Sequence, residues 1–213
     1  MSKNKRTQLK SEFRPRNQFQ EKLTKSIREK DIILAEGPAG VGKTFASVGL
    51  ACRDLAEGRV DRIIIARPAV TVDEDLGYLP GTAEDKINPY LRPVFDALAA
   101  FISPEQLVKH IENGVIEVAP IGFMRGRTFS YCFVIMDEAQ NATKQQMKMF
   151  LTRAGEKSKY IIQGDSSQSD LNGDSGFKDV IGKLEECPVV DIIVGRQEEV
   201  IRSHTVKELL KYL

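Results

Sequence analysis

The sequence is poor in cysteine and histidine and has no long apolar run. Its three cysteines are odd in number and far apart, which argues against a disulfide framework and a CxxC zinc site. Only His110 and His204 are present, and two histidines do not form a His-rich metal centre. No apolar run approaches the roughly 18 residues of a membrane span, and residues 1–10 lack the apolar stretch of a secretion signal. We therefore expect a cytoplasmic protein without a membrane partner.

Net charge is also scarce, because 31 Lys and Arg residues nearly cancel 30 Asp and Glu residues. The balance hides an asymmetry, since residues 1–30 hold ten basic and three acidic residues. The net charge of +1 therefore does not exclude an anionic partner. We expect residues 1–12 to form a flexible basic arm. Residues 13–213 should form one domain, because the chain's 41% hydrophobic content is enough for a core.

Short apolar runs rich in Val and Ile alternate with longer helical patterns. Each run is bounded by polar residues, Gly or Pro, which is typical of parallel strands covered on both faces. The runs lie at 32–35, 63–66, 115–118, 133–136, 160–162 and 189–194. Helices are predicted at 44–57, at 88–101, from the capping box of Thr143 and Gln146 to about 153, and from a second box at Thr205 and Glu208. This alternation predicts an α/β fold with an open, mostly parallel sheet and helices on both faces.

A phosphate-binding loop follows the first predicted strand. The sequence Gly37-Pro38-Ala39-Gly40-Val41-Gly42-Lys43-Thr44 matches G-x4-G-K-T, between a strand and a helix as its mechanism requires. The glycines allow backbone N–H groups to point at phosphate oxygens, and the helix adds its positive N-terminal end. Lys43 is then expected on the β- and γ-phosphates of ATP, and Thr44 on Mg²⁺.

Polar side chains follow two further strands. Asp137 and Glu138 end the run 133–136, and we expect Asp137 to bind the magnesium and Glu138 to polarise an attacking water. Taken alone, such an acidic pair often only caps a helix. Gln168 follows the run 160–162 within Gly164-Asp165-Ser166-Ser167-Gln168, where it is placed to contact the γ-phosphate or the water. An ordinary Asp/Ser turn is the alternative for this segment.

Several blocks together resemble the PhoH-like ATPase family, whose core is similar to that of superfamily 1 helicases. They are the phosphate loop, Arg67-Pro68-Ala69-Val70, Leu76-Gly77-Tyr78-Leu79-Pro80-Gly81, Met124-Arg125-Gly126-Arg127-Thr128, Asp137-Glu138-Ala139-Gln140-Asn141, and Gly164-Asp165 through Ser175-Gly176. The resemblance implies a single RecA-like P-loop NTPase domain that hydrolyses ATP and, in some members, unwinds RNA as a ring. It also implies that Gln18 reads adenine. The segment 200–204 departs from the family's VVRH by an inserted Ser203, which leaves the role of His204 open.

A single lobe requires its catalytic arginine from elsewhere. Monomeric helicases bind ATP between two RecA-like lobes, and the second lobe supplies the arginine that stabilises the transition state. We expect this chain to assemble into a homo-oligomeric ring, with a hexamer as the expected size, through a head-to-tail contact. Arg202 is the candidate finger, because it precedes the last predicted helix in a loop. Arg196 is the alternative.

The segment Phe123-Met124-Arg125-Gly126-Arg127 is the candidate contact with single-stranded RNA or another nucleic acid. Arg125 and Arg127 would bind phosphates while Phe123 stacks on a base. Alternatively, one arginine faces the nucleotide and the other braces the strand at 133–136.

The function expected from these features is an ATP-hydrolysing, RNA-binding motor or RNA helicase without a nuclease domain. A regulatory or scaffold ring that switches a protein partner is the alternative. A small-molecule kinase is disfavoured, because the sequence shows no lid segment with clustered arginines.

Overall fold

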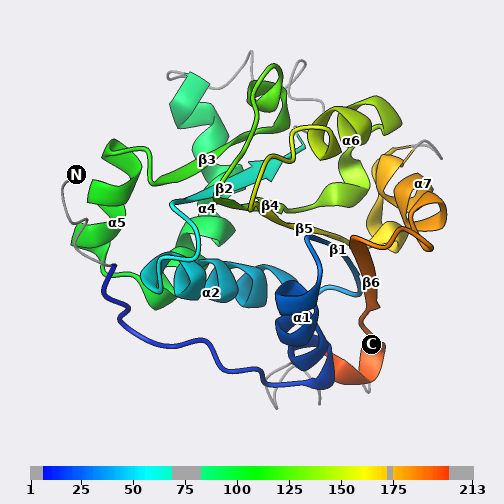
Figure 1. Cartoon of the computed structure of the whole chain (residues 1–213), viewed down its shortest axis with the longest axis horizontal. Helices are drawn as coiled ribbons and strands as arrows, with labels where there is room; N and C mark the ends of the chain where they lie inside the picture. Colours follow the sequence, from blue (N-terminus) through cyan, green and yellow to red (C-terminus); the bar gives the residue numbers. More distant parts are fainter. Residues whose placement is uncertain (1–6, 69–82, 172–174, 202–213) are drawn as a thin grey trace.

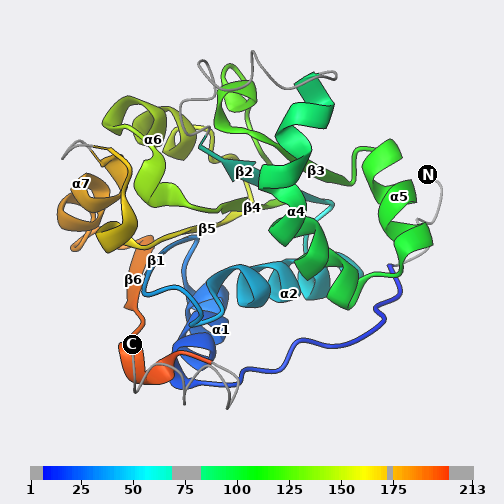
Figure 2. The same ribbon diagram turned by 180° about the vertical axis from the view of Figure 1, so that it is seen from behind.

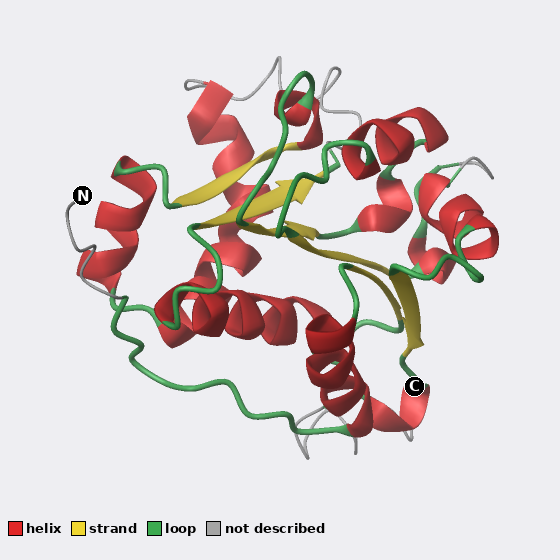
Figure 3. Cartoon of the chain, in the orientation of Figure 1, coloured by secondary structure: helices red, strands yellow, loops and turns green. Residues whose placement is uncertain are grey.

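The computed structural model describes residues 7–68, 83–171 and 175–201. Figures 1 and 3 show an open sheet with helices on both sides. Its strands are β1 (Ile32–Glu36), β2 (Arg62–Arg67), β3 (Ile116–Pro120), β4 (Cys132–Met136), β5 (Lys159–Gly164) and β6 (Val190–Val194). They are all parallel, in the order β3-β2-β4-β5-β1-β6. The predicted α/β class is confirmed, and each predicted apolar run overlaps one strand.

Helices connect the strands. They are α1 (Gln18–Glu29), α2 (Lys43–Ala56), α4 (Ala83–Phe101), α5 (Pro104–Glu112), α6 (Lys144–Leu151) and α7 (Gly176–Lys183). The prediction found α2, α4 and α6 but missed α1, α5 and α7. The capping box of Thr143 and Gln146 is present, whereas the box at Thr205 and Glu208 lies outside the described residues. No described helix combines the length and apolar character needed to cross a membrane.

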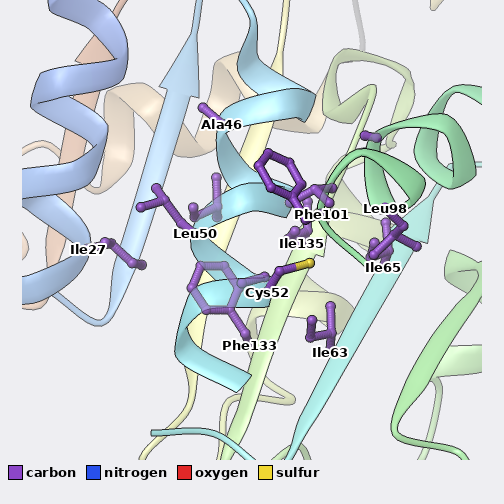
Figure 4. Packing of buried hydrophobic residues seen from close by; sticks show 14 of the residues in the cluster. Ile27, Ala46, Leu50, Cys52, Ile63, Ile65, Leu98, Phe101, Phe133 and Ile135 are labelled. Atoms are coloured by element: carbon purple, nitrogen blue, oxygen red, sulfur yellow. The ribbon is translucent and has the colours of Figure 1, made fainter. Parts of the chain in front are cut away.

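The strands alternate their side chains between two hydrophobic clusters. One cluster contains Ile63, Ile65, Phe133 and Ile135 together with residues of α1, α2, α4 and α5. Figure 4 shows Leu50 and Cys52 of α2 packed beside these strand residues. The other cluster lies on the opposite face and includes Phe150 of α6 and Phe177 of α7. Figure 2 shows these two helices from behind. Helices cover both faces of the sheet, which explains why the strands are continuous apolar runs in the sequence.

The chain enters the fold along the bottom of α2. The predicted arm at 1–12 falls partly outside the described residues, but residues 7–12 run from α5 toward α1 (Figure 1). There the Lys10 amide donates to the Phe101 carbonyl at 2.8 Å. The Phe13 ring packs edge-on against Phe45 and Phe101, with centroid distances of 6.2 and 6.4 Å. This part of the N-terminal segment is therefore fastened to α2 and α4.

Parallel pairing places all six carboxyl ends at one edge of the sheet. Glu36 at the end of β1 is in register with Gly164 of β5 and Val194 of β6, and Met136 of β4 is in register with Ile162 of β5. The segments that follow β1, β4 and β5 therefore emerge side by side. These segments hold the predicted phosphate loop, the predicted pair Asp137 and Glu138, and the predicted Gln168.

Candidate nucleotide site

The phosphate loop joins β1 to α2 and depends on two glycines with positive φ. Gly40 has φ +85° and Gly42 has φ +87°, a region that residues with a Cβ rarely adopt. A Cβ on Gly42 would also collide with Nε2 of Gln20. Gly42, the residue before α2, has no side chain to cap the helix, whereas Asn17 caps α1 and Ser103 caps α5. The first amides of α2 are thus not occupied by a cap, which suits an anion at this helix end.

Lys43 lies over the loop that precedes it. Its Nζ donates to the carbonyls of Gly37 and Pro38, the latter at 3.1 Å. Burial lowers the pKa of Lys43, and the charges of Asp165, Glu138 and Asp137 offset only part of that effect. A phosphate group would supply the negative charge that this partly buried ammonium lacks.

Thr44 and Asp137 meet at the edge of the sheet, although they are far apart in the sequence. The Thr44 hydroxyl donates to Oδ1 of Asp137 at 3.0 Å. Nε2 of Gln163 donates to the same oxygen at 2.7 Å, and Arg67 donates to Oδ2 from Nε at 3.0 Å and from Nη2 at 2.6 Å. Asp137 is 2% exposed. A hydroxyl and a carboxylate are ligands that Mg²⁺ prefers, so the two residues fit the predicted metal.

Glu138 has a left-handed backbone, with φ +56° and ψ +39°, and its side chain is 48% exposed. Nε2 of Gln140 donates to Oε2 of Glu138 at 2.7 Å. The other end of the Gln140 amide accepts from the backbone N–H of Asp165 at 3.1 Å. Gln140 therefore joins the segment after β4 to the segment after β5. The arrangement leaves the Glu138 carboxylate half-exposed at the carboxyl edge of the sheet, where it can accept a proton from water.

Gln168 ends a short 3-10 helix, Ser166–Gln168, directly after β5. The Asp165 side chain caps this turn by accepting from the Ser167 amide at 3.0 Å, and Gln168 itself is exposed. The segment thus forms the Asp/Ser turn that was the alternative interpretation of the sequence, and it also places an exposed Gln168 at the carboxyl edge of the sheet. The proposed contact of Gln168 with phosphate or water stays a prediction.

The segment before α1 supports the phosphate loop from behind. Nδ2 of Asn17 donates to the carbonyls of Val41 at 3.0 Å and of Glu199 at 2.7 Å, and Nε2 of the buried Gln20 also reaches Val41, at 3.1 Å. Gln18, in contrast, is exposed and lines a surface pocket of about 620 Å³ together with Arg196. Its adenine role stays a prediction.

The predicted finger Arg202 lies outside the described residues. The residue before it, Ile201, donates its amide to the Gly40 carbonyl at 2.9 Å, so the C-terminal segment touches the phosphate loop. The alternative, Arg196, is exposed just after β6.

The candidate nucleic-acid segment divides into an exposed part and a braced part. Phe123 is 68% exposed and Arg125 is also exposed. Arg127 instead forms a two-pronged ion pair with Glu117 of β3, at 2.5 and 2.7 Å. Its guanidinium also lies over the Phe129 ring, 4.8 Å from the centroid. Arg127 therefore braces β3, which is a different strand from the one the sequence suggested.

Residues 12–213 match the sequence profile of a protein family described as PhoH-like protein. The chain belongs to this PhoH-like family. A PhoH-like protein of Mycobacterium tuberculosis is 44% identical over 200 residues, covering 93% of this chain and 57% of the relative. Protein PhoH of Escherichia coli is 45% identical over 192 residues, covering 88% of this chain and 54% of the relative. The chain thus spans little more than half the length of these relatives.

Two solved structures of other proteins have a similar fold. The large terminase of a thermophilic bacteriophage aligns with a TM-score of 0.60 and 14% identity, covering 93% of this chain and 50% of that one. The helicase domain of Hef from Pyrococcus furiosus aligns with a TM-score of 0.50 and 13% identity, covering 85% of this chain and 38% of that one. These likenesses show that the PhoH-like chain has the RecA-like fold expected from its sequence.

Sequence reasoning missed several polar residues around this edge of the PhoH-like domain. Gln163, Gln140 and Gln20 carry amides that join separate segments, and Arg67 pairs with Asp137. A signal existed for two of them: Arg67 and Gln163 are polar residues at the ends of apolar runs, where a parallel sheet presents side chains to a site. Their partners follow only from strand order.

Proposed function

We propose that the chain binds ATP with magnesium at the carboxyl edge of its sheet and hydrolyses it. The observation that carries the proposal is the meeting of Thr44 and Asp137, whose side chains hydrogen-bond at 3.0 Å at the open N-terminus of α2. Two sequence motifs with complementary chemistry thus converge on one point. Membership of the PhoH-like family agrees with this function.

The phosphate loop, residues 37–42, and Lys43 hold the phosphates, and Gln18 reads the adenine. Thr44 and Asp137 hold the magnesium. When bound, the magnesium neutralises the charge that develops on the phosphate oxygens. Its ligands are held in place beforehand, because Asp137 is 2% exposed and accepts hydrogen bonds on both oxygens.

Glu138 accepts the proton of the attacking water, since it is the half-exposed carboxylate beside Lys43 and Asp137. Gln168 contacts the γ-phosphate or that water from the neighbouring segment. Arg202 acts on the site of the next subunit in a homo-oligomeric ring, which we take to be a hexamer.

The ring works as a motor on single-stranded RNA. Phe123 and Arg125 make the contact, because both are exposed and combine a flat ring with a cation. Arg127 orders the segment through Glu117 and is no longer a phosphate contact in this proposal.

Phosphate release from ATP, measured with and without single-stranded RNA at several salt concentrations, tests this function. The proposal predicts stimulation by RNA that falls steeply with salt. Arg125→Ala should lose most of the stimulation while keeping basal hydrolysis, and Lys178→Ala, an exposed cation on α7, should keep both. Hydrolysis without RNA binding or stimulation would favour a regulatory ring that acts on a protein partner.

A further inference from the structure

A fully buried amide lies beneath the predicted metal ligands. Gln163 is at the end of β5 with 0% of its surface exposed. Its Nε2 is 2.7 Å from Oδ1 of Asp137 and 3.1 Å from Oγ1 of Thr44. Its Oε1 accepts from the hydroxyl of Ser47, which is also 0% exposed, at 2.6 Å. One side chain therefore touches the phosphate-loop helix and the carboxylate after β4.

The chemistry of its neighbours fixes the orientation of this amide. An ionised carboxylate only accepts hydrogen bonds, so the end of Gln163 that faces Asp137 carries the two N–H groups. The opposite end is then the carbonyl oxygen, which requires the Ser47 hydroxyl to donate. Both amide hydrogens and the carbonyl have partners, as a buried amide needs.

The same contacts direct the oxygens that would face a cation. The Thr44 hydroxyl gives its hydrogen to Asp137 and accepts from Gln163, which leaves one lone pair of Oγ1 unused by these bonds. Oδ1 of Asp137 accepts from both Thr44 and Gln163, so the carboxyl group cannot rotate without breaking buried hydrogen bonds. Arg67 holds Oδ2 of the same carboxylate. Gln163 is the side chain that contacts both Thr44 and Oδ1 of Asp137, so it links the directions of the two ligands.

We propose that Gln163, anchored by Ser47, is the positioning residue of the divalent cation site. It sets the orientation of Thr44 and Asp137 so that magnesium and nucleotide bind together. Neither nucleotide motif of the sequence contains Gln163. The inference rests on the proposed nucleotide function and adds to it a determinant of metal affinity.

The test is the dependence of nucleotide affinity on magnesium, measured by binding of a fluorescent non-hydrolysable ATP analogue with Mg²⁺ and with EDTA. Gln163→Met keeps the length of the side chain but removes every hydrogen bond. We expect the gain in affinity from Mg²⁺ to fall by about 10–100-fold, the range for lost partners of metal ligands. Affinity in EDTA should stay unchanged, because the loop and Lys43 are untouched.

Ser47→Ala is the second variant, because it leaves Gln163 in place and removes only its anchor. In this variant the gain in nucleotide affinity from Mg²⁺ should also fall, but by less than in Gln163→Met. The matched control is Ser26→Ala, which deletes another hydroxyl bond, 2.6 Å from the buried Ser26 of α1 to Oδ2 of Asp191 in β6. That variant should retain the full effect. Thermal unfolding of each variant separates a lost fold from a lost cation site.

The outcomes separate this inference from the proposed function. If the wild-type chain binds no nucleotide, or gains nothing from Mg²⁺, the proposed function fails and the inference with it. If the wild type gains affinity from Mg²⁺ and a folded Gln163→Met or Ser47→Ala gains equally, the inference alone is overturned. Equal losses in Ser47→Ala and Ser26→Ala would also overturn it.

Discussion

Glu138 adopts a backbone conformation that is unfavourable for its type. Its φ of +56° lies in the left-handed region, where a non-glycine residue stores strain. This conformation places the carboxylate at the carboxyl edge of the sheet, where it accepts a hydrogen bond from the Gln140 amide. We interpret this as stability given up for the position of the proposed base.

Glu138→Asn should therefore stabilise the fold while it abolishes hydrolysis. Asparagine tolerates the left-handed region better, so we expect the free energy of unfolding to rise by about 1 kcal/mol. Glu138→Gln is the control, because it also loses the carboxylate but keeps an ordinary side chain. Urea denaturation of both variants provides the measurement. Equal stability of the two would contradict the strain argument.

Lys43 makes nucleotide affinity dependent on pH. Burial lowers its pKa in the free protein, and a bound triphosphate favours the charged form and so raises the pKa in the complex. Affinity should be full below the free-state pKa and should fall as pH rises through it. Titrations of nucleotide affinity from neutral pH upward would show this fall. Lys43→Arg, which keeps its charge throughout, should show a flat profile, and a flat wild-type profile would contradict the role of Lys43.

At the scale of elements, local patterns predicted the strands, α2 and the phosphate loop. The apolar runs and the spacing from Gly37 to Thr44 can be recognised in the sequence, because each depends only on residues that are close together in it. The helix α1 was not predicted, although Asn17 caps it and its buried Phe19, Leu23 and Ile27 recur every four residues. The role of Gln163 was missed for a different reason: it depends on β5 lying beside β4, which local sequence does not specify.

The N-terminal segment is held to the domain by an aromatic contact. Phe13 packs on Phe45 and Phe101. It also lies close to Gly49, because a Cβ added to Gly49 would be 2.7 Å from the Cβ of Phe13. Phe13→Ala should lower the free energy of unfolding by roughly 2 kcal/mol, less than for a fully buried ring.

The same change should free residues 7–12 for proteolysis near Lys10 without altering nucleotide affinity. Limited digestion followed by mass spectrometry checks the cleavage. Phe123→Ala is the matched control, because Phe123 is 68% exposed and its loss should leave stability unchanged. Unchanged stability and protection in Phe13→Ala would show that this contact does not fasten the segment.

At the scale of the whole molecule, the account requires that subunits complete each other's sites. Arg202→Ala should retain ATP binding and lose turnover by a factor of about 10³–10⁵, the range for an arginine finger. Glu138→Gln should be inactive for a different reason. Mixed subunits of the two variants should regain part of the activity, because some interfaces then combine an intact finger with an intact base.

Phosphate release from the mixture, with molecular mass in solution measured in the presence of ATP, checks this arrangement. Arg196→Ala tests the alternative finger, an exposed arginine that follows β6, and it should keep normal turnover if Arg202 is the finger. A monomeric mass, or normal turnover by Arg202→Ala, would contradict the shared site.

The most direct test of the central claim compares ATP hydrolysis and ATP binding in the wild type and in Glu138→Gln. The account predicts phosphate release by the wild type, equal nucleotide affinity in both proteins, and turnover that is slower by about 10²–10⁴-fold in the variant. A wild-type chain that binds ATP without hydrolysing it, or a Glu138→Gln variant that hydrolyses it at the wild-type rate, would contradict the account.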